Sequence, residues 1–231
     1  ARPAGLAAAE QLRRHGYKVT VYDRYDRGGG LMIYGIPNFK LEKDVVQRRA
    51  ELLADAGVAY ELGCEIGRDL SLDELRARHD AVLIACGVYE PRDLKAPGVG
   101  SGGIVQAIDY LTASNRKGLG DAVPDFDSGL LDANGRRVVV IGGGDTAMDC
   151  VRTAVRQGAR SVACLYRRDR QNMPGSLREV GHAEEEGVEF VWLAQPEAFA
   201  EQDGRVAQVR AQRIHLGVPD ATGRQVPRPI E

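Results

Sequence analysis

The chain has few cysteines, and no two of them form a C-x-x-C pair. They stand far apart, at Cys64, Cys86, Cys150 and Cys164. This spacing argues against a zinc site, an iron–sulfur cluster or a redox dithiol within the chain. Each cysteine lies in an apolar or small-residue stretch, so we expect all of them to be packed core thiols. Reduced thiols are typical of cytoplasmic proteins, and the cytoplasm is the compartment we expect.

Long apolar runs and clustered basic charge are also lacking. No apolar run approaches the roughly 18 residues that a membrane-spanning helix needs, and no signal-peptide pattern is present. The net charge is −2, and the arginines are scattered along the chain. We therefore expect neither a membrane nor a nucleic acid as a partner.

The residue sets that bind metals or perform acid–base and nucleophilic catalysis are missing as well. The histidines, at His15, His79, His182 and His215, have no metal-ligand spacing. The sequence contains no nucleophile elbow and no P-loop. We expect no metal site and no catalytic side chain.

What the chain does contain is a glycine-rich turn between apolar segments. VVVIGGGDTAMDC (Val138–Cys150) is typical of a strand, a turn and a helix, and SVACLY (Ser161–Tyr166) follows as a second strand. Gly142, Gly144 and Ala147 fit the pattern G-x-G-x-x-G/A. There the first glycine makes a tight turn, the second lets the backbone approach a pyrophosphate, and the third small residue lets helix and strand pack closely. The helix N-terminus favours the negative charge of that pyrophosphate, so this stretch predicts a dinucleotide site.

The residues after the second strand indicate which nucleotide is preferred. NAD sites usually place an acidic residue there for the ribose 2′-hydroxyl, whereas NADP sites place arginine near the 2′-phosphate. Arg167 and Arg168 stand at this place, with Arg170 close behind. Arginine forms charge-assisted, often bidentate hydrogen bonds to phosphate oxygens, so the pattern favours NADPH. The alternative is a solvated edge of the domain without a ligand.

A second, damaged nucleotide motif opens the chain. Leu6–His15 is predicted as a helix, and Lys18–Asp23 as a buried strand that ends in an acid. Gly5 and Asp23 have the spacing of the last fingerprint glycine and the ribose-binding carboxylate. The first strand and the first glycine are missing, and Arg2 stands where the second glycine belongs. A bulky side chain there obstructs a pyrophosphate, and we expect the chain to be a fragment truncated at both ends.

The following residues fit a flavin half-site. Arg27–Val46 contains a glycine run that we interpret as a loop beside the flavin, the alternative being a flexible loop. Ser71 and Glu74 form a predicted capping box. AVLIACG (Ala81–Gly87) is predicted as a buried parallel strand that meets a cofactor at its end.

The remaining segments alternate between helix and strand. Further helices are predicted over Glu42–Ala56, Ile104–Ser114, Thr146–Gln157 and Leu177–Gly187. Further strands are predicted over Val58–Gly63, Val188–Leu193 and Arg205–Leu216, the last of them antiparallel after an Asp-Gly turn. We expect Pro91–Gly103 to be a crossover, Arg116–Asn134 a long loop, and the tail from Gly217 to lack a closing element. Trp192 is expected in the core.

The predicted fold class is therefore α/β, with two Rossmann-like dinucleotide-binding domains. Residues 1–97 are the incomplete FAD-binding domain, which lacks its first strand and its C-terminal part. Residues 98–231 comprise a linker and an NADPH-binding domain inserted into the FAD domain.

Four stretches resemble a known family: GGGLMIYGIPNFKLEKDVV, AVLIACGVYEPRDL, IGGGDTAMDCVRTAVRQGA and YRRDRQNMPGSLREV. They are similar to the middle of the small (beta) subunits of NADPH-dependent glutamate synthases, and the resemblance covers essentially the whole chain. The same module occurs in dihydropyrimidine dehydrogenase and related flavin-linked reductases. The resemblance implies hydride transfer from NADPH to FAD, and then single electrons passing through iron–sulfur clusters to the large (alpha) subunit. That partner makes glutamate from 2-oxoglutarate and glutamine-derived ammonia.

The resemblance also implies the cofactor contacts. The implied FAD contacts are Gly5, Asp23, Gly30, Leu31 and Lys40, with Ile66 and Gly87 as further candidates. The implied NADPH contacts are Gly142, Gly143, Gly144, Asp145, Thr146, Arg167 and Arg168. The family's cluster-binding cysteines and its second flavin-contacting Gly-Asp segment have no counterpart here. We expect the fragment to bind NADPH, to hold FAD weakly and to be inactive alone.

Three alternatives stay open. The module could feed another acceptor, as in dihydropyrimidine dehydrogenase or a ferredoxin-type reductase. A thioredoxin-reductase-like enzyme would need a redox dithiol in the nucleotide domain, where Cys150 has no C-x-x-C partner. A nucleotide-binding module without turnover is the third.

Overall fold

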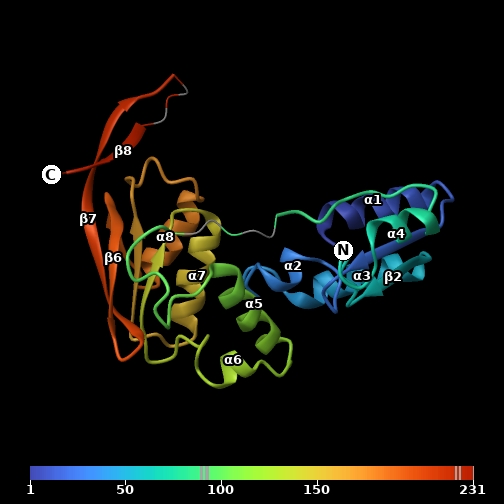
Figure 1. Cartoon of the computed structure of the whole chain (residues 1–231), viewed down its shortest axis with the longest axis horizontal. Helices are drawn as coiled ribbons and strands as arrows, with labels where there is room; N and C mark the ends of the chain where they lie inside the picture. Colours follow the sequence, from blue (N-terminus) through green and yellow to red (C-terminus); the bar gives the residue numbers. More distant parts are fainter. Residues whose placement is uncertain (89–90, 92–93, 222, 224, 231) are drawn as a thin grey trace. The chain divides into compact units, whose positions relative to one another are not determined.

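The computed structural model describes residues 1–88, 91, 94–221, 223 and 225–230. The chain divides into two compact units (Figure 1). Unit 1 comprises Ala1–Glu90 with Gly118–Gly120, and unit 2 comprises Pro91–Lys117 with Asp121–Glu231. Each combines parallel strands with helices, as the predicted α/β class requires.

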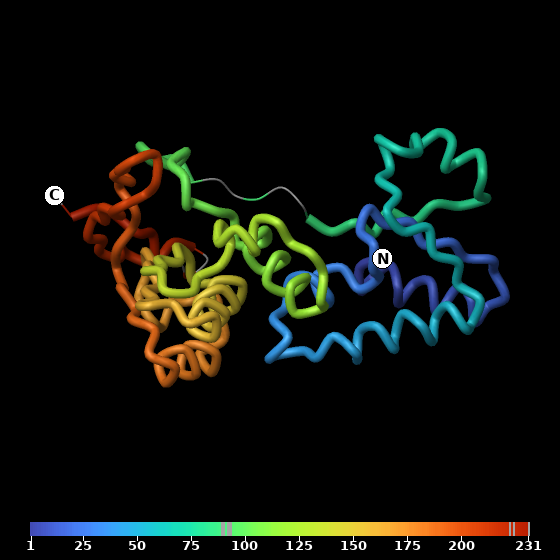
Figure 2. Tube along the Cα trace, turned by 90° about the horizontal axis from the view of Figure 1, so that it is seen from below, coloured from blue at the N-terminus to red at the C-terminus, as the bar shows by residue number. Residues whose placement is uncertain are grey.

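A two-stranded parallel sheet organises unit 1. Strand β1 (Val19–Asp23) pairs with β2 (Val58–Leu62) along their whole lengths. The helices of this unit are α1 (Pro3–Arg14), α2 (Leu31–Tyr34), α3 (Lys43–Asp55) and α4 (Leu72–Arg78). Helices α1 and α3 lie beside each other and contact the sheet (Figure 2). The buried core between them consists of Leu6, Ala9, Val21, Leu53 and Val58.

Local sequence signals explain where these helices begin and end. Helix α1 starts with Pro3, whose missing N–H is not needed in a first turn, and it stops before Gly16 at φ +88°. The predicted capping box of α4 is confirmed. The Ser71 hydroxyl accepts from the Glu74 backbone N–H at 3.1 Å, and the Glu74 carboxylate accepts from the Ser71 N–H at 3.0 Å.

The prediction of a buried strand at Ala81–Gly87 is wrong. No strand forms there, and Leu83 and Ile84 are 65% and 71% exposed. A strand persists only where a neighbour completes its backbone hydrogen bonds. In the described part of unit 1, β1 and β2 pair with each other and no strand pairs with this segment. The segment also exposes Cys86, so the expectation of a core thiol is wrong at that position.

Unit 2 is built on a three-stranded parallel sheet and an antiparallel meander. The parallel strands β3 (Arg137–Ile141), β4 (Ser161–Tyr166) and β5 (Glu189–Trp192) lie in that order. The meander consists of β6 (Ala194–Gln202), β7 (Arg205–Pro219) and β8 (Gln225–Pro229), and Figure 1 shows β6 and β7 side by side. The helices are α5 (Ala107–Gly118), α6 (Pro124–Asp127), α7 (Asp145–Arg156) and α8 (Leu177–Glu185).

The core of unit 2 lies between helices α7 and α8 and the parallel sheet. Its fully buried side chains include Met148 and Val151 of α7, Cys164 of β4 and Val180 of α8. As expected, Trp192 packs against this core, with its ring stacked on a neighbouring phenylalanine ring at 4.8 Å.

Two predictions for the less regular parts of unit 2 are wrong. The stretch expected to be a long loop contains the end of α5 and the short helix α6, where Lys117 pairs with Asp127 at 2.5 Å. The tail from Gly217 does have a closing element, because β8 pairs antiparallel with β7. Pro227 and Pro229 of β8 lie on an edge strand, where a missing N–H costs no ladder hydrogen bond.

No helix in the described residues has the length and apolar character needed to cross a membrane. Nor do these residues bring together three or more side chains that could ligate a metal ion.

Thiol labelling tests the burial of the cysteines. Burial raises the pKa of Cys150 and of Cys164 to about 12, so almost none of either thiol is the reactive thiolate at mildly alkaline pH. Iodoacetamide should therefore alkylate exposed Cys86 in the native chain, and Cys150 and Cys164 only after unfolding. Peptide mass spectrometry measures the order, with Cys86→Ser as the control. Native labelling of Cys150 at the rate of Cys86 would contradict the structure.

Candidate dinucleotide sites

The glycine turn of unit 2 follows β3 directly. Gly142 has φ +146°, a conformation that side chains disfavour, and its N–H continues the sheet by donating to the Leu165 carbonyl at 3.1 Å. Its own carbonyl lies 3.3 Å from the Cys164 sulfur, within reach of that thiol's weak donor. The first glycine of the pattern is thus required by the turn itself.

The second glycine of the run is required by packing. A Cβ on Gly143 would lie 2.5 Å from the Tyr166 ring, closer than real Cβ contacts come. Tyr166 is the last residue of β4 and is buried. Only a residue without a side chain lets this ring lie against the turn.

The third glycine, Gly144, is required neither by a left-handed backbone conformation nor by packing. Gly144 has an ordinary φ of −91°, and no atom lies within 4 Å of the position that its Cβ would take. It precedes α7, whose N-terminus presents backbone N–H groups and the positive end of the helix dipole. Neither the backbone nor the packing of the chain requires glycine at this position. The close approach of a pyrophosphate to the backbone would require it.

The turn is held from the other side by the start of α8. The Gly175 N–H donates to the Gly143 carbonyl at 3.0 Å, and the Ser176 N–H donates to the Asp145 carboxylate at 3.0 Å. Predicted site residues Asp145 and Thr146 are both exposed. Gly175 was not identified from the sequence as part of this arrangement. Its only sequence signal is a small residue eight positions after Arg167.

An ion-pair cluster connects α7 to α8 and so fixes this arrangement. The buried Arg152 guanidinium donates to Glu179 at 2.7 Å and to Glu186 at 2.7 Å. Burial alone would raise the pKa of Glu186. Hydrogen bonds from Arg156 and Arg152 outweigh it and lower that pKa to about 2. The cluster is therefore charged at neutral pH and holds the two helices together.

The arginine loop, defined as Tyr166–Asn172, leaves β4 at the same sheet edge as the glycine turn. β3 and β4 are parallel neighbours with Ile141 opposite Leu165, so the residues after both strands meet at one edge. Arg167 is exposed. Arg168 is half-buried, and in the described part of the chain its Nε atom is buried without a hydrogen-bond partner. The structure thus brings both predicted arginines to the edge where the glycine turn lies.

The motif of unit 1 has a different geometry. The Asp23 carboxylate is buried and already accepts from the Ala1 amino group at 2.5 Å and from the Tyr25 N–H at 2.9 Å. A Cβ on Gly5 would make an ordinary van der Waals contact of 3.4 Å with the Ala85 Cβ, so packing does not by itself require glycine there. The Tyr25 N–H is thus a donor within the unit to the carboxylate predicted to hold a ribose.

Arg2 fills the space between two of the predicted flavin contacts. A Cβ on Gly30 would lie 2.7 Å from the Arg2 Cγ, and a Cβ on Gly87 would lie 2.8 Å from its Nη1. The Arg2 residue is only 9% exposed. The side chain that the sequence predicts to obstruct this motif therefore occupies it.

The other predicted flavin contacts are placed around unit 1. Leu31 begins α2 directly after Gly30 and is 40% exposed, whereas Lys40 is half-buried in the following turn. Ile66 lies in an isolated bridge with Leu70. The contacts around Arg2 thus bring Gly30 and Gly87 together, while Ile66 belongs to a separate turn.

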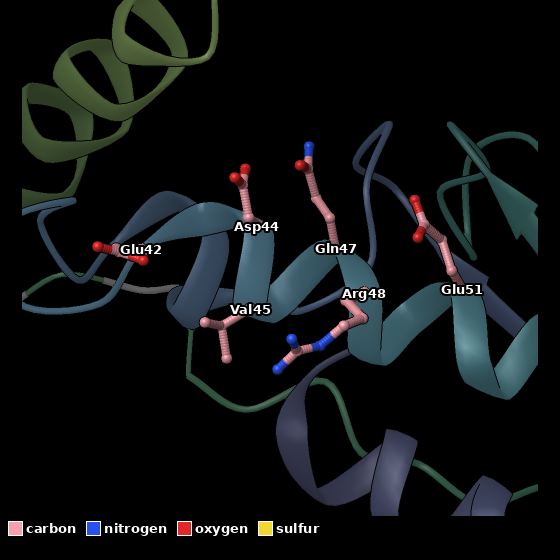
Figure 3. Close-up of a pocket in the computed structure, with 6 residues that line it drawn as sticks. All are labelled: Glu42, Asp44, Val45, Gln47, Arg48 and Glu51. Carbon is pink, nitrogen blue, oxygen red and sulfur yellow. The ribbon is translucent and has the colours of Figure 1, made fainter.

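A shallow surface pocket runs along α3 and is distinct from both motifs. Figure 3 shows its lining, formed by Glu42, Asp44, Val45, Gln47, Arg48 and Glu51. None of these residues was predicted to bind a cofactor. The pocket is an open, largely acidic strip of helix surface.

Comparison with known proteins extends these observations. The profile of the family described as pyridine nucleotide-disulphide oxidoreductase matches residues 1–218. The chain is 68% identical over its whole length to the glutamate synthase [NADPH] small chain of Azospirillum brasilense, of which it covers 48%. It is 46% identical over its whole length to the putative oxidoreductase AegA of Escherichia coli, of which it covers 35%. The chain thus spans about half, or less, of these relatives.

Solved structures with low sequence identity share the fold. FprA of Mycobacterium tuberculosis in complex with NADPH aligns with a TM-score of 0.79 at 19% identity, covering 98% of this chain and 64% of that one. Thioredoxin reductase of Lactococcus lactis aligns with a TM-score of 0.60 at 20% identity, covering 99% of this chain and 72% of that one. The predicted α/β Rossmann-like fold is confirmed.

Two neighbouring glycines make a matched pair for testing the turn. Gly143→Ala should lower the free energy of unfolding by about 1–3 kcal/mol, because its Cβ meets the Tyr166 ring. Gly144→Ala should change stability by less than about 1 kcal/mol. It should nevertheless weaken NADPH at least about tenfold, because its Cβ occupies the space left for the pyrophosphate. Urea unfolding and NADPH fluorescence titration measure both effects, and unchanged NADPH affinity in Gly144→Ala would contradict the assignment.

Proposed function

Because the chain belongs to the pyridine nucleotide-disulphide oxidoreductase family, we propose that it is the electron-entry module of an NADPH-dependent oxidoreductase of the glutamate synthase small-chain type. The observation that carries the proposal is Gly144, a glycine explained by neither its backbone conformation nor its neighbours. The similarity to glutamate synthase small chains, over the whole chain, supports the same conclusion.

The residues of unit 2 fit NADPH. Gly142–Thr146 and the N-terminus of α7 would hold the pyrophosphate, and Arg167 with Arg168 would hold the 2′-phosphate. The buried Nε of Arg168 has no hydrogen-bond partner in the described chain, which supports a phosphate as its natural acceptor. NADPH supplies a hydride, whose direct transfer needs no side chain as acid, base or nucleophile. The task of these residues is to bind and orient the coenzyme.

The residues of unit 1 do not fit FAD as they stand. Arg2 occupies the space beside Gly30 and Gly87. We therefore assign NADPH binding to residues 98–231, and we assign residues 1–97 to a flavin domain whose pyrophosphate position is filled. The isolated chain is proposed to bind NADPH without turnover.

A thiol-based reaction is the less favoured function. It needs a pair of reactive cysteines, whereas Cys150 and Cys164 are buried thiols with pKa values near 12. The similarity to thioredoxin reductase concerns the fold alone.

For the whole protein we propose the chemistry that the resemblance to glutamate synthase small chains implies. Hydride would pass from NADPH to a flavin, and electrons would continue through iron–sulfur clusters outside this chain to a large-subunit partner that makes glutamate in the cytoplasm. The alternative acceptors are those of dihydropyrimidine dehydrogenase-like or ferredoxin-type reductases. The similarity to a putative oxidoreductase of another name, AegA, keeps these alternatives relevant.

Replacing both arginines tests the coenzyme assignment. Arg167→Ala with Arg168→Ala should weaken NADPH binding by about tenfold to a hundredfold, since a charge-assisted hydrogen bond contributes about 1.5–3 kcal/mol. NADH binding should change by less than about twofold, because NADH lacks the 2′-phosphate. Calorimetric titration measures both constants, with Arg210→Ala, an exposed arginine of β7, as the control. Equal losses for the two coenzymes would sink the 2′-phosphate assignment.

Replacing Arg2 tests the obstruction in unit 1. Arg2→Gly should strengthen FAD binding by about tenfold, because removing a clash of this kind is worth about 1–3 kcal/mol. Quenching of flavin fluorescence measures the affinity. Arg14→Ala, at an exposed position of α1, is the matched control. Equal FAD affinity in Arg2→Gly and in the unaltered chain would show that Arg2 does not fill the site.

A further inference from the structure

Asn172 closes the arginine loop. Its backbone N–H and its side-chain Nδ2 both donate to the same oxygen of Asp169, at 2.9 Å and 2.8 Å. Its carbonyl accepts from the Tyr166 hydroxyl at 3.2 Å. The first and last residues of the loop are therefore joined, with both coenzyme-selecting arginines between them.

The hydrogen bonds to Asp169 also orient the only carboxylate of the arginine loop. Asp169 stands between Arg168 and Arg170 in the chain, and a carboxylate there competes with a phosphate for guanidinium groups. Asn172 occupies one oxygen of this carboxylate with two donors. It thereby orients the one acidic group of the loop toward the loop's own backbone.

The loop is connected to the C-terminal meander. Asn172 Nδ2 donates to Gln225 Oε1 at 3.2 Å, and Gln225 Nε2 donates to the Gly217 carbonyl at 3.2 Å. Gln225 begins β8, and Gly217 lies on the paired strand β7. The side chain of Gln225 thus links the β7–β8 hairpin to the arginine loop, and both of its polar groups are used.

Two other contacts hold the loop: the Leu193 N–H donates to the Arg168 carbonyl at 3.2 Å, and the Arg170 guanidinium pairs with Glu184 at 2.5 Å. Arg167 is exposed, and an unrestrained arginine side chain loses up to about 2 kcal/mol of rotamer entropy when it is ordered on a phosphate. A loop whose backbone is already fixed avoids the additional entropy cost of ordering its backbone when it binds a phosphate.

We propose that Asn172 and Gln225 are positioning residues for coenzyme selection. They hold the arginine loop in the shape that binds a 2′-phosphate, and the β7–β8 hairpin is therefore part of the NADPH specificity apparatus. The proposal rests on the assignment of Arg167 and Arg168 to the 2′-phosphate made above.

Two mononucleotides separate selection from general binding. Adenosine 2′,5′-bisphosphate carries the 2′-phosphate, and adenosine 5′-monophosphate is otherwise the same molecule. The full 231-residue chain and its variants Asn172→Ala and Gln225→Leu are titrated with both by calorimetry. Gln208→Leu, the same change at an exposed position of β7, is the matched control.

The preference for the bisphosphate should fall about fivefold or more in Asn172→Ala and about threefold in Gln225→Leu, since one net hydrogen bond is worth about 0.5–1.5 kcal/mol. Affinity for the monophosphate should stay within about twofold, and Gln208→Leu should match the unaltered chain. A purely structural role would lower both affinities together and leave their ratio unchanged.

Each other outcome overturns the proposal. An unchanged preference in Asn172→Ala and Gln225→Leu shows that these residues do not position the loop. Equal losses for both ligands show general support of the fold rather than selection. If the unaltered chain itself does not prefer the bisphosphate, the arginine assignment fails first, and this result is distinct from the other two.

Discussion

The packing of the Tyr166 ring against Gly143 is the contact on which the sheet edge with the glycine turn and the arginine loop depends. It adds a side-chain contact between the end of β4 and the turn after β3, beyond the last ladder bond from the Gly142 N–H to the Leu165 carbonyl. The Tyr166 hydroxyl then reaches the Asn172 carbonyl, so the glycine turn and the arginine loop share one anchor. A residue larger than glycine at 143 would displace the ring and, with it, the loop that carries Arg167 and Arg168. One aromatic contact therefore helps to set the distance between the glycine turn and the arginine loop.

The two units differ at the position of the second glycine in the dinucleotide pattern, and this difference changes the space available to a ligand. In unit 2 the second fingerprint glycine is Gly144, and the space beside it is open. In unit 1 Arg2 stands at the corresponding position, and its side chain fills the space that Gly30 and Gly87 leave. Both units keep parallel strands and a helix after the motif, so the fold tolerates either residue. The residue at this position affects ligand binding rather than folding, because the backbone can approach a pyrophosphate only where no side chain intervenes.

Sequence patterns predicted the elements whose signals are local. The glycine turn, the capping box at Ser71 and the buried strand β4 each follow from a few adjacent residues. Ala81–Gly87 failed because apolar residues make a strand only where a neighbouring strand is available, and that information does not lie in the segment itself. The strand β8 failed for the opposite reason. Its prolines argue against a strand, but they are tolerated at an edge, and the pairing partner in β7 supplies the stability.

The candidate site shows the same division between motif and context. The glycines and arginines that would contact the coenzyme were readable, because each has a direct chemical reason. Asn172, Gly175 and Gln225 were not, since their importance arises from distant residues that the fold brings together. Under the proposal made above, the arginine pair alone does not define the coenzyme selectivity of this unit. Transferring the YRR sequence to another Rossmann-like domain would move the charges without the Asn172 bonds that keep Asp169 turned away, and without the hairpin that holds the loop. The specificity of such a site is then a property of the loop and its supports together, and a coenzyme preference inferred from the motif holds only where those supports are present.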